Sequence, residues 1–251
     1  MQKITISASS HVGLVREHNE DAILVSHQYL RDAHVNTSAF LSADERYVVA
    51  VCDGLGGQNA GEVASMDVVE QLSKRIDTLP SGLTSDSLCQ TMKEWVAEEH
   101  DYLLAVGRNE AMLDGMGTTM VALLFYEGRI FWMNCGDSRL YRMRNGVLRQ
   151  ISQDHSLFQL THQPADAHII TNCLGGGASD VFLDICDITN ESVEGDVFLL
   201  CSDGLTDMLG HDEIESLLAE TSDASVMTDR AVQNGGVDNV SVCVLSIDCW
   251  S

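Results

Sequence analysis

The 251-residue sequence lacks the features that define several large classes of proteins. It has 14 lysines and arginines against 38 acids, and the formal net charge of −24 repels nucleic-acid backbones and anionic membranes. No apolar run is long enough to span a bilayer, and the first residues do not form a basic start followed by an apolar stretch. We therefore expect no nucleic-acid partner and no membrane span, and cations are the favoured partners.

Cysteine pairs, proline and flexible linkers are also scarce. The eight cysteines contain no CxxC pair and mostly lie inside apolar runs, which is typical of small core residues. Two prolines and no Pro-, Gly- or Ser-rich linker leave the chain undivided, and 45% hydrophobic residues can supply a sizeable core. We expect a single domain over residues 1–251, a monomer, and a reducing, cytoplasmic setting.

Apolar periodicity occurs in blocks of strands and in pairs of helices. Spacings of three and four predict helices over residues 59–79 and 86–106, the second after a Ser85 cap. Between residues 118 and 149, apolar runs are separated by Glu127-Gly128 and Asn145-Gly146, which predicts successive hairpins. Residues 31–46 are polar and are predicted to form an irregular connection. Strand blocks and helix pairs together predict an α+β fold.

Several predicted strands begin or end beside an aspartate. The apolar run VVAVC leads into Asp53, and Asp137, Asp203 and Asp238 lie in the same way at the ends of other strands. Carboxylates that are brought together repel one another unless a cation binds. An all-oxygen cluster without cysteine or histidine at ligand spacing favours Mg²⁺, Mn²⁺ or Ca²⁺ over Zn²⁺. The sequence therefore predicts a site for hard cations where these strand ends meet.

A basic residue precedes adjacent acids in residues 16–21, REHNED, a pattern that is typical of a solvated turn when it occurs alone. In the company of the strand-end acids it suits phosphate chemistry. Two cations about 3.5–4 Å apart, bridged by an aspartate and a water, can generate a hydroxide nucleophile and hold a phosphoryl oxygen. Arg16 can bind a phosphate through its two-pronged guanidinium, which lysine does poorly. The combination indicates hydrolysis of a phosphomonoester.

Seven short motifs follow one another between residues 13 and 245. They are Arg16 to Asp21, Asp53-Gly54-Leu55-Gly56-Gly57, Gly117-Thr118-Thr119, Gly136-Asp137-Ser138-Arg139, Asp154-His155-Ser156, Ser202-Asp203-Gly204 and Gly236-Val237-Asp238-Asn239. In this order they resemble the metal-dependent protein phosphatase family, also called PPM or type 2C phosphatases. The resemblance implies a four-layer αββα sandwich of two mostly antiparallel sheets, flanked by helix pairs, with metals bound at the sheet edge.

The resemblance also implies a ligand set for two Mn²⁺ or Mg²⁺ ions. Asp53 matches the acid that bridges both ions in the family. Glu20 and the main-chain carbonyl of Gly54 complete one site by this comparison. Asp203 and Asp238 serve the other. The nucleophile expected from the family is a water or hydroxide that bridges the two metals.

Other matches lie outside these two metal sites. Asp21 is expected to order metal-bound waters, Asp137 to contribute to a third and weaker metal site, and Arg16 to bind the phosphate. Threonines and serines in the motifs have no recognisable His/Asp partners in sequence, which argues against a serine nucleophile. Gly56, Gly57, Gly117 and Gly136 are expected to shape the backbone, and His155 is expected to hold structure by hydrogen bonding.

Two departures from the family pattern limit what can be carried over. Leu55 stands where many eukaryotic members have a histidine that protonates the leaving group, and an apolar residue there points to the bacterial branch. Proton delivery is then left to a metal-bound water or to His18. The segment of residues 157–173, which corresponds to the flap beside the active site, is short, so substrate choice cannot be transferred.

The resemblance predicts a serine/threonine protein phosphatase. Its expected partners are phosphorylated proteins and a Ser/Thr kinase that it opposes in bacterial signalling. Two alternatives remain at this point. A phosphoprotein-binding pseudophosphatase would be favoured by a missing metal acid, but the acids are all present. A calcium-binding structural domain is suggested by the acids alone, but the EF-hand spacing is absent.

Overall fold

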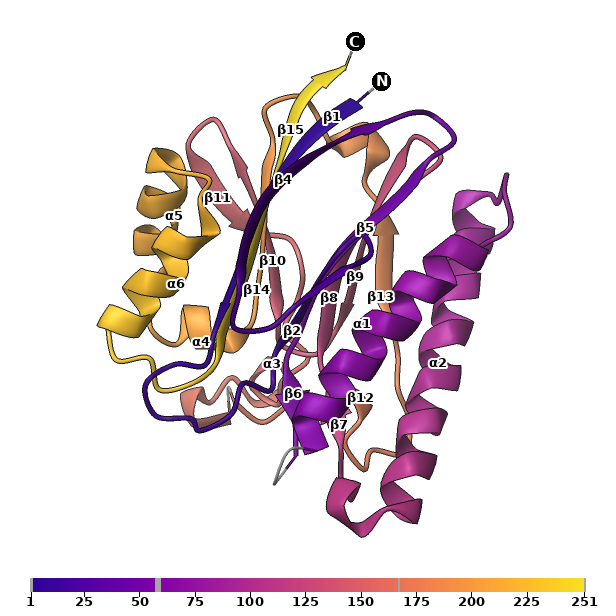
Figure 1. The fold of residues 1–251 in the computed structure, drawn as a ribbon, viewed down its shortest axis with the longest axis vertical. Helices are drawn as coiled ribbons and strands as arrows, with labels where there is room; N and C mark the ends of the chain where they lie inside the picture. Colours follow the sequence, from indigo (N-terminus) through magenta and orange to yellow (C-terminus); the bar gives the residue numbers. More distant parts are fainter. Residues whose placement is uncertain (1, 57–59, 167, 251) are drawn as a thin grey trace.

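The computed structural model describes residues 2–56, 60–166 and 168–250 of the chain. Two six-stranded antiparallel sheets stack face to face, and helices cover the outer face of each sheet (Figure 1). The two chain ends lie together at one end of this sandwich, and the short strand β6 (Gly54–Leu55) lies at the other end. The predicted four-layer αββα fold is confirmed.

The first sheet has the strand order β11-β10-β14-β15-β1-β4. Strands β1 and β15 pair from Gln2 to His11 with one register shift after Lys3, and His11 lies opposite Val240 at the end nearest the cleft described below. The strands are β1 (Gln2–His11), β4 (His34–Leu41), β10 (Arg139–Arg144), β11 (Val147–Gln150), β14 (Val197–Cys201) and β15 (Val240–Trp250).

The second sheet has the order β13-β9-β8-β5-β2-β3. Its strands are β2 (Ala22–Val25), β3 (Gln28–Leu30), β5 (Arg46–Cys52), β8 (Met120–Tyr126), β9 (Arg129–Cys135) and β13 (Asp184–Asp187). A small third sheet joins β6 to β7 (Gly117–Thr118) and β12 (Leu174–Gly175). It attaches the loop after β5 to a segment more than a hundred residues later in the chain.

The outer layers are helical. Helices α1 (Ala60–Thr78) and α2 (Ser85–Asn109) cover the second sheet, and α5 (His211–Glu220) and α6 (Ala224–Gln233) cover the first (Figure 1). Shorter helical segments lie in the connections: α3 (Phe158–Thr161), α4 (Asp203–Thr206) and the 3-10 turns Ala111–Leu113, Pro164–Asp166 and Thr189–Glu191.

The apolar run in strand β5 is continuous because both faces of this strand are buried. Val49 and Val51 belong to the apolar cluster between the two sheets, whereas Val48, Ala50 and Cys52 belong to the cluster between the second sheet and its helices. All five side chains are buried. Because successive residues of a strand point to opposite faces, a strand in an inner layer must be apolar at every position. The same rule makes β8 (MVALLFY) buried throughout.

Most predicted elements are confirmed with small changes at their ends. The hairpin turns at Glu127-Gly128 and Asn145-Gly146 have positive φ at both residues, as a two-residue type I′ turn requires. Helix α1 follows the prediction to within one residue at its C-terminal end, and its predicted first residue, Asn59, lies outside the described residues. Gly57, which we expected to shape the loop, also lies outside them.

Two local predictions are wrong. Residues 34–41, predicted as part of an irregular connection, form strand β4, which pairs with β1 over Gln2 to Ser9. This edge strand is polar because most of its side chains are at least partly exposed, so it lacks the apolar run on which the prediction depended. The cap of α2 is Thr84 and not Ser85, because the Thr84 side chain accepts a hydrogen bond from the backbone N–H of Ser87.

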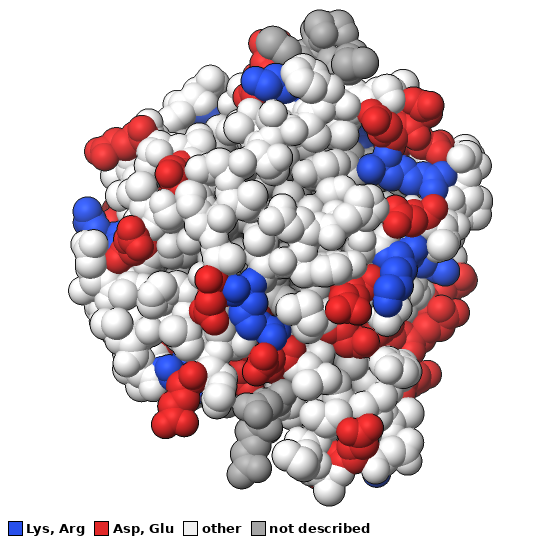
Figure 2. All heavy atoms as spheres, in the orientation of Figure 1, with Lys and Arg blue, Asp and Glu red and all other residues white. Residues whose placement is uncertain are grey.

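The surface agrees with the composition. On the face shown in Figure 2, acidic side chains outnumber basic ones and gather on the side formed by α1 and α2. Among the described residues, no helix is both long and apolar enough to cross a membrane. The seven cysteines whose side chains are described are all free thiols, and five of them are buried.

Candidate metal-binding active site

A cleft of about 330 Å³ opens at the end of the sandwich where β6 lies. It is lined by acids from both sheets together with one arginine, one histidine and a few uncharged residues. The lining residues are Arg16, Glu20, Asp53, Gly54, Leu55, Gly56, Asp137, His168, Ile170, Asp203, Asp207, Asp238 and Asn239. All of the predicted metal ligands and the predicted phosphate-binding arginine are among them.

The acids reach the cleft because each lies just outside a strand. Asp53 follows β5, Asp137 follows β9, and Asp203 follows β14. Glu20 and Asp238 precede β2 and β15, which run in the opposite sense to their neighbours β5 and β14. In an antiparallel pair the end of one strand and the start of the next lie at the same place. The alternation of strand direction therefore brings all five acids to one end of the sandwich.

The backbone of Asp53 is held by the threonines next to β7. The Asp53 carbonyl accepts hydrogen bonds from the Thr118 hydroxyl and from the Thr119 N–H, each at 2.8 Å. The Asp53 N–H donates to the Thr119 hydroxyl at 3.1 Å. That hydroxyl also lies 2.7 Å from the Ser138 hydroxyl. These contacts give Thr118, Thr119 and Ser138 a positioning role, consistent with the argument against a serine nucleophile.

Close backbone packing explains two of the glycines in the motifs. A Cβ on Gly54 would lie 2.3 Å from the carbonyl oxygen of Gly61, at the start of α1. A Cβ on Gly204 would lie 1.9 Å from the carbonyl oxygen of Asn239. No side chain fits at such distances, so the loop after β5 and the start of α4 need glycine to come this close to their neighbours. These contacts bring Asp53 toward Glu20, and Asp203 toward Asp238.

Burial and mutual repulsion raise the pKa values of the acids in the cleft. The pKa of Asp53 lies well above its usual range because the carboxyl is desolvated and is repelled by Asp21 and Asp203. The pKa of Asp203 is raised first by desolvation and then by Asp207 and Asp238. Desolvation, followed by repulsion from Asp203, raises the pKa of Asp137 to about 7. Keeping the carboxylates of such a cluster ionised costs free energy, and a bound cation would offset this cost.

The hydrogen bonding of Asp21 indicates whether the residues of the cleft fit a hydrated cation. Its carboxylate is completely buried behind the cleft, and Oδ2 accepts a hydrogen bond of 2.8 Å from the Ser202 hydroxyl. The other oxygen, Oδ1, is buried and has no partner among the described residues. A buried carboxylate oxygen normally has a donor. An acceptor without a partner beside Asp53 and Asp203 fits a site whose missing donors are cation-bound waters.

Arg16 lies at the mouth of the cleft, with half of its side chain exposed. Its Nη2 donates a hydrogen bond of 2.7 Å to Oδ2 of Asp238. This bond, followed by the charge of Asp238, raises the pKa of Arg16. Asn239 ties the same loops together, because its side-chain oxygen accepts from the Glu20 N–H and its amide group donates to the His18 carbonyl. The predicted phosphate-binding and metal-binding residues are thus physically connected.

The predicted metal ligands share the cleft but do not all meet at one point. Among the described residues, three ligand atoms of His, Cys, Asp or Glu lie within 4.8 Å of one another only in His168, Asp203 and Asp207. Sequence reasoning missed two of these three residues. Asp207 had a usable signal, because it follows Asp203 by four residues in a helical segment and so lies on the same face. His168 had none, since its position depends on the path of residues 157–173.

Comparison with known proteins identifies the family. Residues 23–234 match the protein phosphatase 2C family. The serine/threonine phosphatase stp of Listeria monocytogenes is 32% identical over 94% of this chain and 93% of its own length. The chain belongs to the protein phosphatase 2C family. The predicted family and the predicted enzyme class, a phosphoprotein phosphatase, are therefore confirmed.

Solved structures extend this result for the type 2C phosphatase described here. The catalytic domain of the serine/threonine protein phosphatase PstP, in complex with two manganese ions, is 31% identical and covers 99% of this chain, with a TM-score of 0.75. That chain is covered completely. The S. agalactiae serine/threonine phosphatase, at 24% identity, has a TM-score of 0.80 over 98% of this chain and supports the fold alone.

The structure also bears on proton delivery in this type 2C phosphatase. Leu55 lines the cleft beside Asp53, so the position that holds histidine in many eukaryotic members is apolar here. His18 is exposed and does not line the cleft. His155 accepts a hydrogen bond from the Gly136 N–H at Nδ1, and its Nε2 lies 3.1 Å from Asp184. These contacts support the structural role expected for His155.

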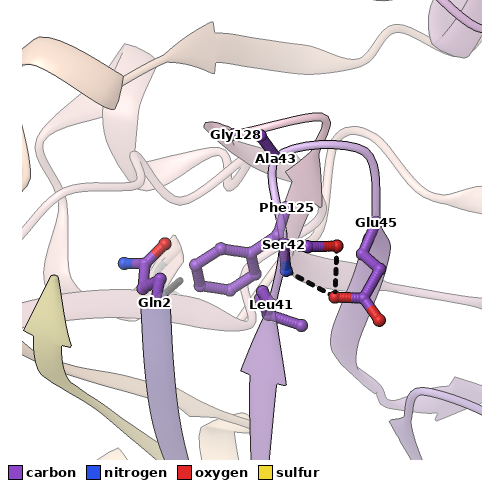
Figure 3. A pocket seen from close by; sticks show the side chains of 7 residues that line it. All are labelled: Gln2, Leu41, Ser42, Ala43, Glu45, Phe125 and Gly128. Atoms are coloured by element: carbon purple, nitrogen blue, oxygen red, sulfur yellow. Dashed lines mark hydrogen bonds between the residues drawn. The ribbon is translucent and has the colours of Figure 1, made fainter. Parts of the chain in front are cut away.

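A second hollow lies at the opposite end of the sandwich, near the chain ends. It has a volume of about 90 Å³ and is lined by Gln2, Leu41, Ser42, Ala43, Glu45, Phe125 and Gly128 (Figure 3). Glu45, its one acid, accepts hydrogen bonds from the backbone and hydroxyl groups of Ser42. This hollow has no cationic side chain for a phosphate and no second carboxylate for a metal. The acidic cleft holds all of the predicted metal ligands together with Arg16, and it is the candidate active site of the phosphatase.

Proposed function

We propose that this protein is a Mn²⁺- or Mg²⁺-dependent serine/threonine phosphatase that removes phosphate from phosphoserine and phosphothreonine in other proteins. The observation that carries the proposal is the position of Arg16, the one lysine or arginine among the residues that line a cleft in which six of the lining side chains are carboxylates. Carboxylates alone repel a phosphomonoester. Cations held by those carboxylates, together with a guanidinium, attract it.

The proposed metal site uses the residues that line the cleft. Asp53 would be shared by two cations, Glu20 and the carbonyl of Gly54 would hold one of them, and Asp203 and Asp238 would hold the other. Asp21 accepts hydrogen bonds from waters around them, and Asp137 contributes to a weaker third position. When bound, the two cations activate a water molecule for attack and neutralise charge on the phosphoryl group.

The remaining residues bind and orient the substrate. Arg16 places its guanidinium against the phosphate oxygens, and its bond to Asp238 fixes the guanidinium relative to the metal site. Leu55 and Ile170 form apolar walls of the cleft and limit the access of bulk water to the reacting phosphate.

The cellular role is part of the same proposal. The relatives in Listeria and Mycobacterium are named as serine/threonine phosphatases, which supports phosphorylated proteins as substrates and a Ser/Thr kinase as the activity that is opposed. The described cysteines are free thiols, which fits a reducing compartment and hence the cytoplasm.

The direct test measures hydrolysis of p-nitrophenyl phosphate and of a phosphothreonine peptide by the purified chain in millimolar Mn²⁺, in Mg²⁺ and in EDTA. We expect turnover of both substrates with metal and none in EDTA. Equal activity in EDTA would contradict the metal-dependent mechanism. Binding of the phosphopeptide without turnover would identify a pseudophosphatase instead.

A further inference from the structure

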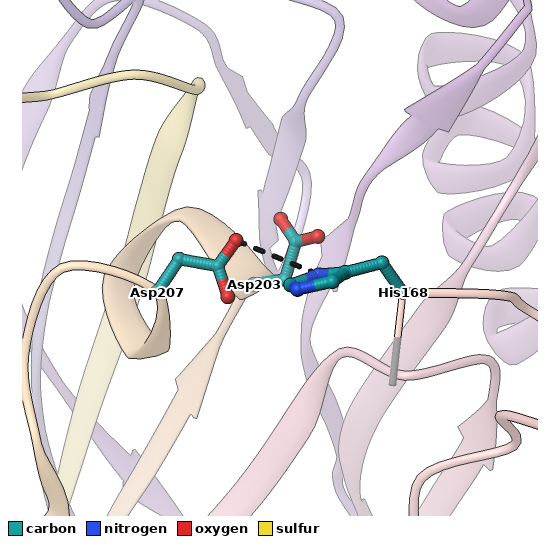
Figure 4. Close-up of side chains that lie close together, drawn as sticks. All are labelled: His168, Asp203 and Asp207. Carbon is teal, nitrogen blue, oxygen red and sulfur yellow. Dashed lines mark ion pairs between the residues drawn. The ribbon is translucent and has the colours of Figure 1, made fainter. Parts of the chain in front are cut away.

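His168 is the one histidine among the residues that line the acidic cleft. It belongs to the segment of residues 157–173, whereas the other two residues of its cluster come from α4 and the position just after it. Figure 4 shows the imidazole pointing from its loop toward the Asp207 carboxylate, with the Asp203 side chain between the two. Nδ1 of His168 lies 3.9 Å from Oδ2 of Asp207. The short flap therefore adds a nitrogen donor to a cleft whose other donors are oxygens.

We propose that His168, Asp203 and Asp207 form a third cation site, selective for Zn²⁺ or a similar transition-metal ion over Mg²⁺. It differs from the third position expected at Asp137. The proposal rests on the proposed function in one respect only, which is that Asp203 serves both this site and the catalytic pair. No other family-derived ligand takes part.

The geometry is close to what a zinc ion requires. One ligand atom from each of the three side chains lies within 4.8 Å of the other two. Ligands about 2.0–2.2 Å from a tetrahedral Zn²⁺ lie roughly 3.4 Å apart, so a contraction of about 0.5–1.4 Å closes the site. The His168 side chain is 70% exposed and can make this movement without disturbing the core. A water molecule would complete the fourth position.

The chemistry of the donors sets the selectivity. Mg²⁺ prefers an octahedral shell of oxygens and gives up its waters reluctantly, whereas imidazole nitrogen suits zinc and later transition metals. Two carboxylates supply the negative charge, and their mutual repulsion is one of the reasons that the pKa of Asp203 is raised. An exposed ion pair between His168 and Asp207 alone would contribute little, about 0–1 kcal/mol.

The chain provides a matched control for this site. His27 lies 3.7 Å from Asp77, and its side chain is 69% exposed, so it resembles the pair of His168 and Asp207. Those two residues belong to no group of three ligands within 4.8 Å. If any exposed His–Asp pair could bind Zn²⁺, then His27→Gln would weaken Zn²⁺ binding as much as His168→Gln does.

The experiment measures Zn²⁺ binding to the full chain by equilibrium dialysis in saturating Mg²⁺, for wild type, His168→Gln, Asp207→Asn and His27→Gln. Loss of an outer-shell partner already weakens metal binding by about 10–100-fold. We therefore expect His168→Gln and Asp207→Asn each to weaken one Zn²⁺ site by at least tenfold, and His27→Gln to leave it unchanged. A crystal soaked in Zn²⁺ should show an anomalous peak between the three side chains.

Two results would overturn the inference: unchanged Zn²⁺ binding in both His168→Gln and Asp207→Asn, or an anomalous peak elsewhere. Because binding is read without substrate, the outcome is separate from that of the proposed function. A wild-type chain that hydrolyses phosphopeptides but has no Zn²⁺ site at His168 refutes only this inference. A chain that binds Zn²⁺ at His168 but shows no phosphatase activity refutes only the proposed function.

Discussion

At the scale of single residues, Arg16 is expected to make two interactions. In the structure it donates to Asp238, and in the proposed reaction it also binds the phosphate. A hydrogen bond to a charged group contributes about 1.5–3 kcal/mol, which corresponds to roughly a 10–100-fold change in kcat/KM. We expect Arg16→Ala to lower kcat/KM of a phosphothreonine peptide by this factor, mainly through KM. Arg16→Lys should recover part of the loss, because lysine keeps the charge but not the two-pronged geometry.

The control is Arg149→Ala, which removes an exposed arginine on β11, outside the cleft. It removes one positive charge, as Arg16→Ala does, and should leave kcat/KM unchanged. Measuring the Mn²⁺ concentration for half-maximal activity separates the two roles of Arg16. If Arg16→Ala changes this concentration and leaves KM unchanged, the arginine orients Asp238 and does not bind phosphate.

The site residues that were predicted correctly are those whose position is indicated by a local sequence pattern. An apolar run followed by Asp and Gly places Asp53 at a strand end, and the same pattern places Asp203. Their side chains both line the cleft. Asp207 and His168 were missed for different reasons. Asp207 stands one helical turn after Asp203, a spacing that was available but not used. His168 reaches the cleft through the conformation of a loop, which no periodicity encodes.

At the scale of elements, the contact between α1 and α2 holds a buried acid. Glu99 of α2 is only 7% exposed. Its pKa is raised to about 8 by burial and by the nearby carboxyl group of Asp67, on α1. The charge of Lys74 acts in the opposite direction. Glu99 therefore binds its proton more tightly in the folded chain than in the unfolded chain, where the pKa is about 4.3.

The sign of the pH effect follows from this difference. The stabilisation from protonated Glu99 is complete below the unfolded pKa and is lost as pH rises through about 8. Glu99→Gln stays neutral, so its melting temperature minus that of wild type should increase from pH 5 to pH 9. One unit of pKa displacement is worth about 1.4 kcal/mol. We expect the free energy of unfolding of Glu99→Gln to rise by at least this amount relative to that of wild type between pH 5 and pH 9. Thermal unfolding followed by circular dichroism measures it.

Glu98→Gln is the matched control, because Glu98 is the exposed neighbour of Glu99 on the same helix. It removes the same charge and should shift the melting temperature equally at every pH. The acids in the cleft also titrate, but their contribution is common to wild type and variants and cancels in the difference. A difference between Glu99→Gln and wild type that is flat from pH 5 to pH 9 would contradict the buried-acid interpretation.

The elements show where sequence patterns suffice. Helix α1 was predicted almost to its last residue because its apolar face repeats every three to four residues and Pro80 follows closely. Strand β4 was missed because it is an edge strand with polar residues in most of its outward positions, and its inward residues Val35, Ala39 and Leu41 alternate with them and so form no apolar run. The cap of α2 was placed one residue late, since Thr84 and Ser85 are equally good caps by type. Only the observed bond from the Ser87 N–H distinguishes them.

At the scale of the whole molecule, periodicity predicted the α+β class but not the order of strands. The resemblance to the phosphatase family implied two stacked antiparallel sheets, but it also left the strand order open, and only the structure gives it. In the first sheet β1 lies between β15 and β4, so the chain's first long strand pairs with its last. Pairings between distant parts of a sequence leave no local pattern, because strand register depends on tertiary packing. The convergence of five acids at one end is a consequence of those pairings.

Because the chain has a net charge of −24 and an acidic cleft, we expect cation binding to stabilise the whole folded chain. A ligand that binds only the folded state stabilises it by about 2.7 kcal/mol at a concentration 100 times Kd. For a domain of 150–250 residues, each 1 kcal/mol raises the melting temperature by about 2–4 °C. We therefore expect Mn²⁺ at that concentration to raise the melting temperature of the chain by roughly 5–11 °C relative to EDTA.

Asp53→Asn separates site binding from general screening of negative charge. The pKa of Asp53 is raised by burial and by neighbouring acids, so its charge destabilises the cation-free fold. We expect the variant to melt at a higher temperature than wild type in EDTA at pH 8, to gain little from Mn²⁺, and to lose turnover. NaCl at matched ionic strength should affect both proteins alike, because screening acts on every exposed charge. An equal rise with Mn²⁺ in wild type and Asp53→Asn would show that the ions bind elsewhere on the acidic surface, and Asp53 would then not be the bridge between them.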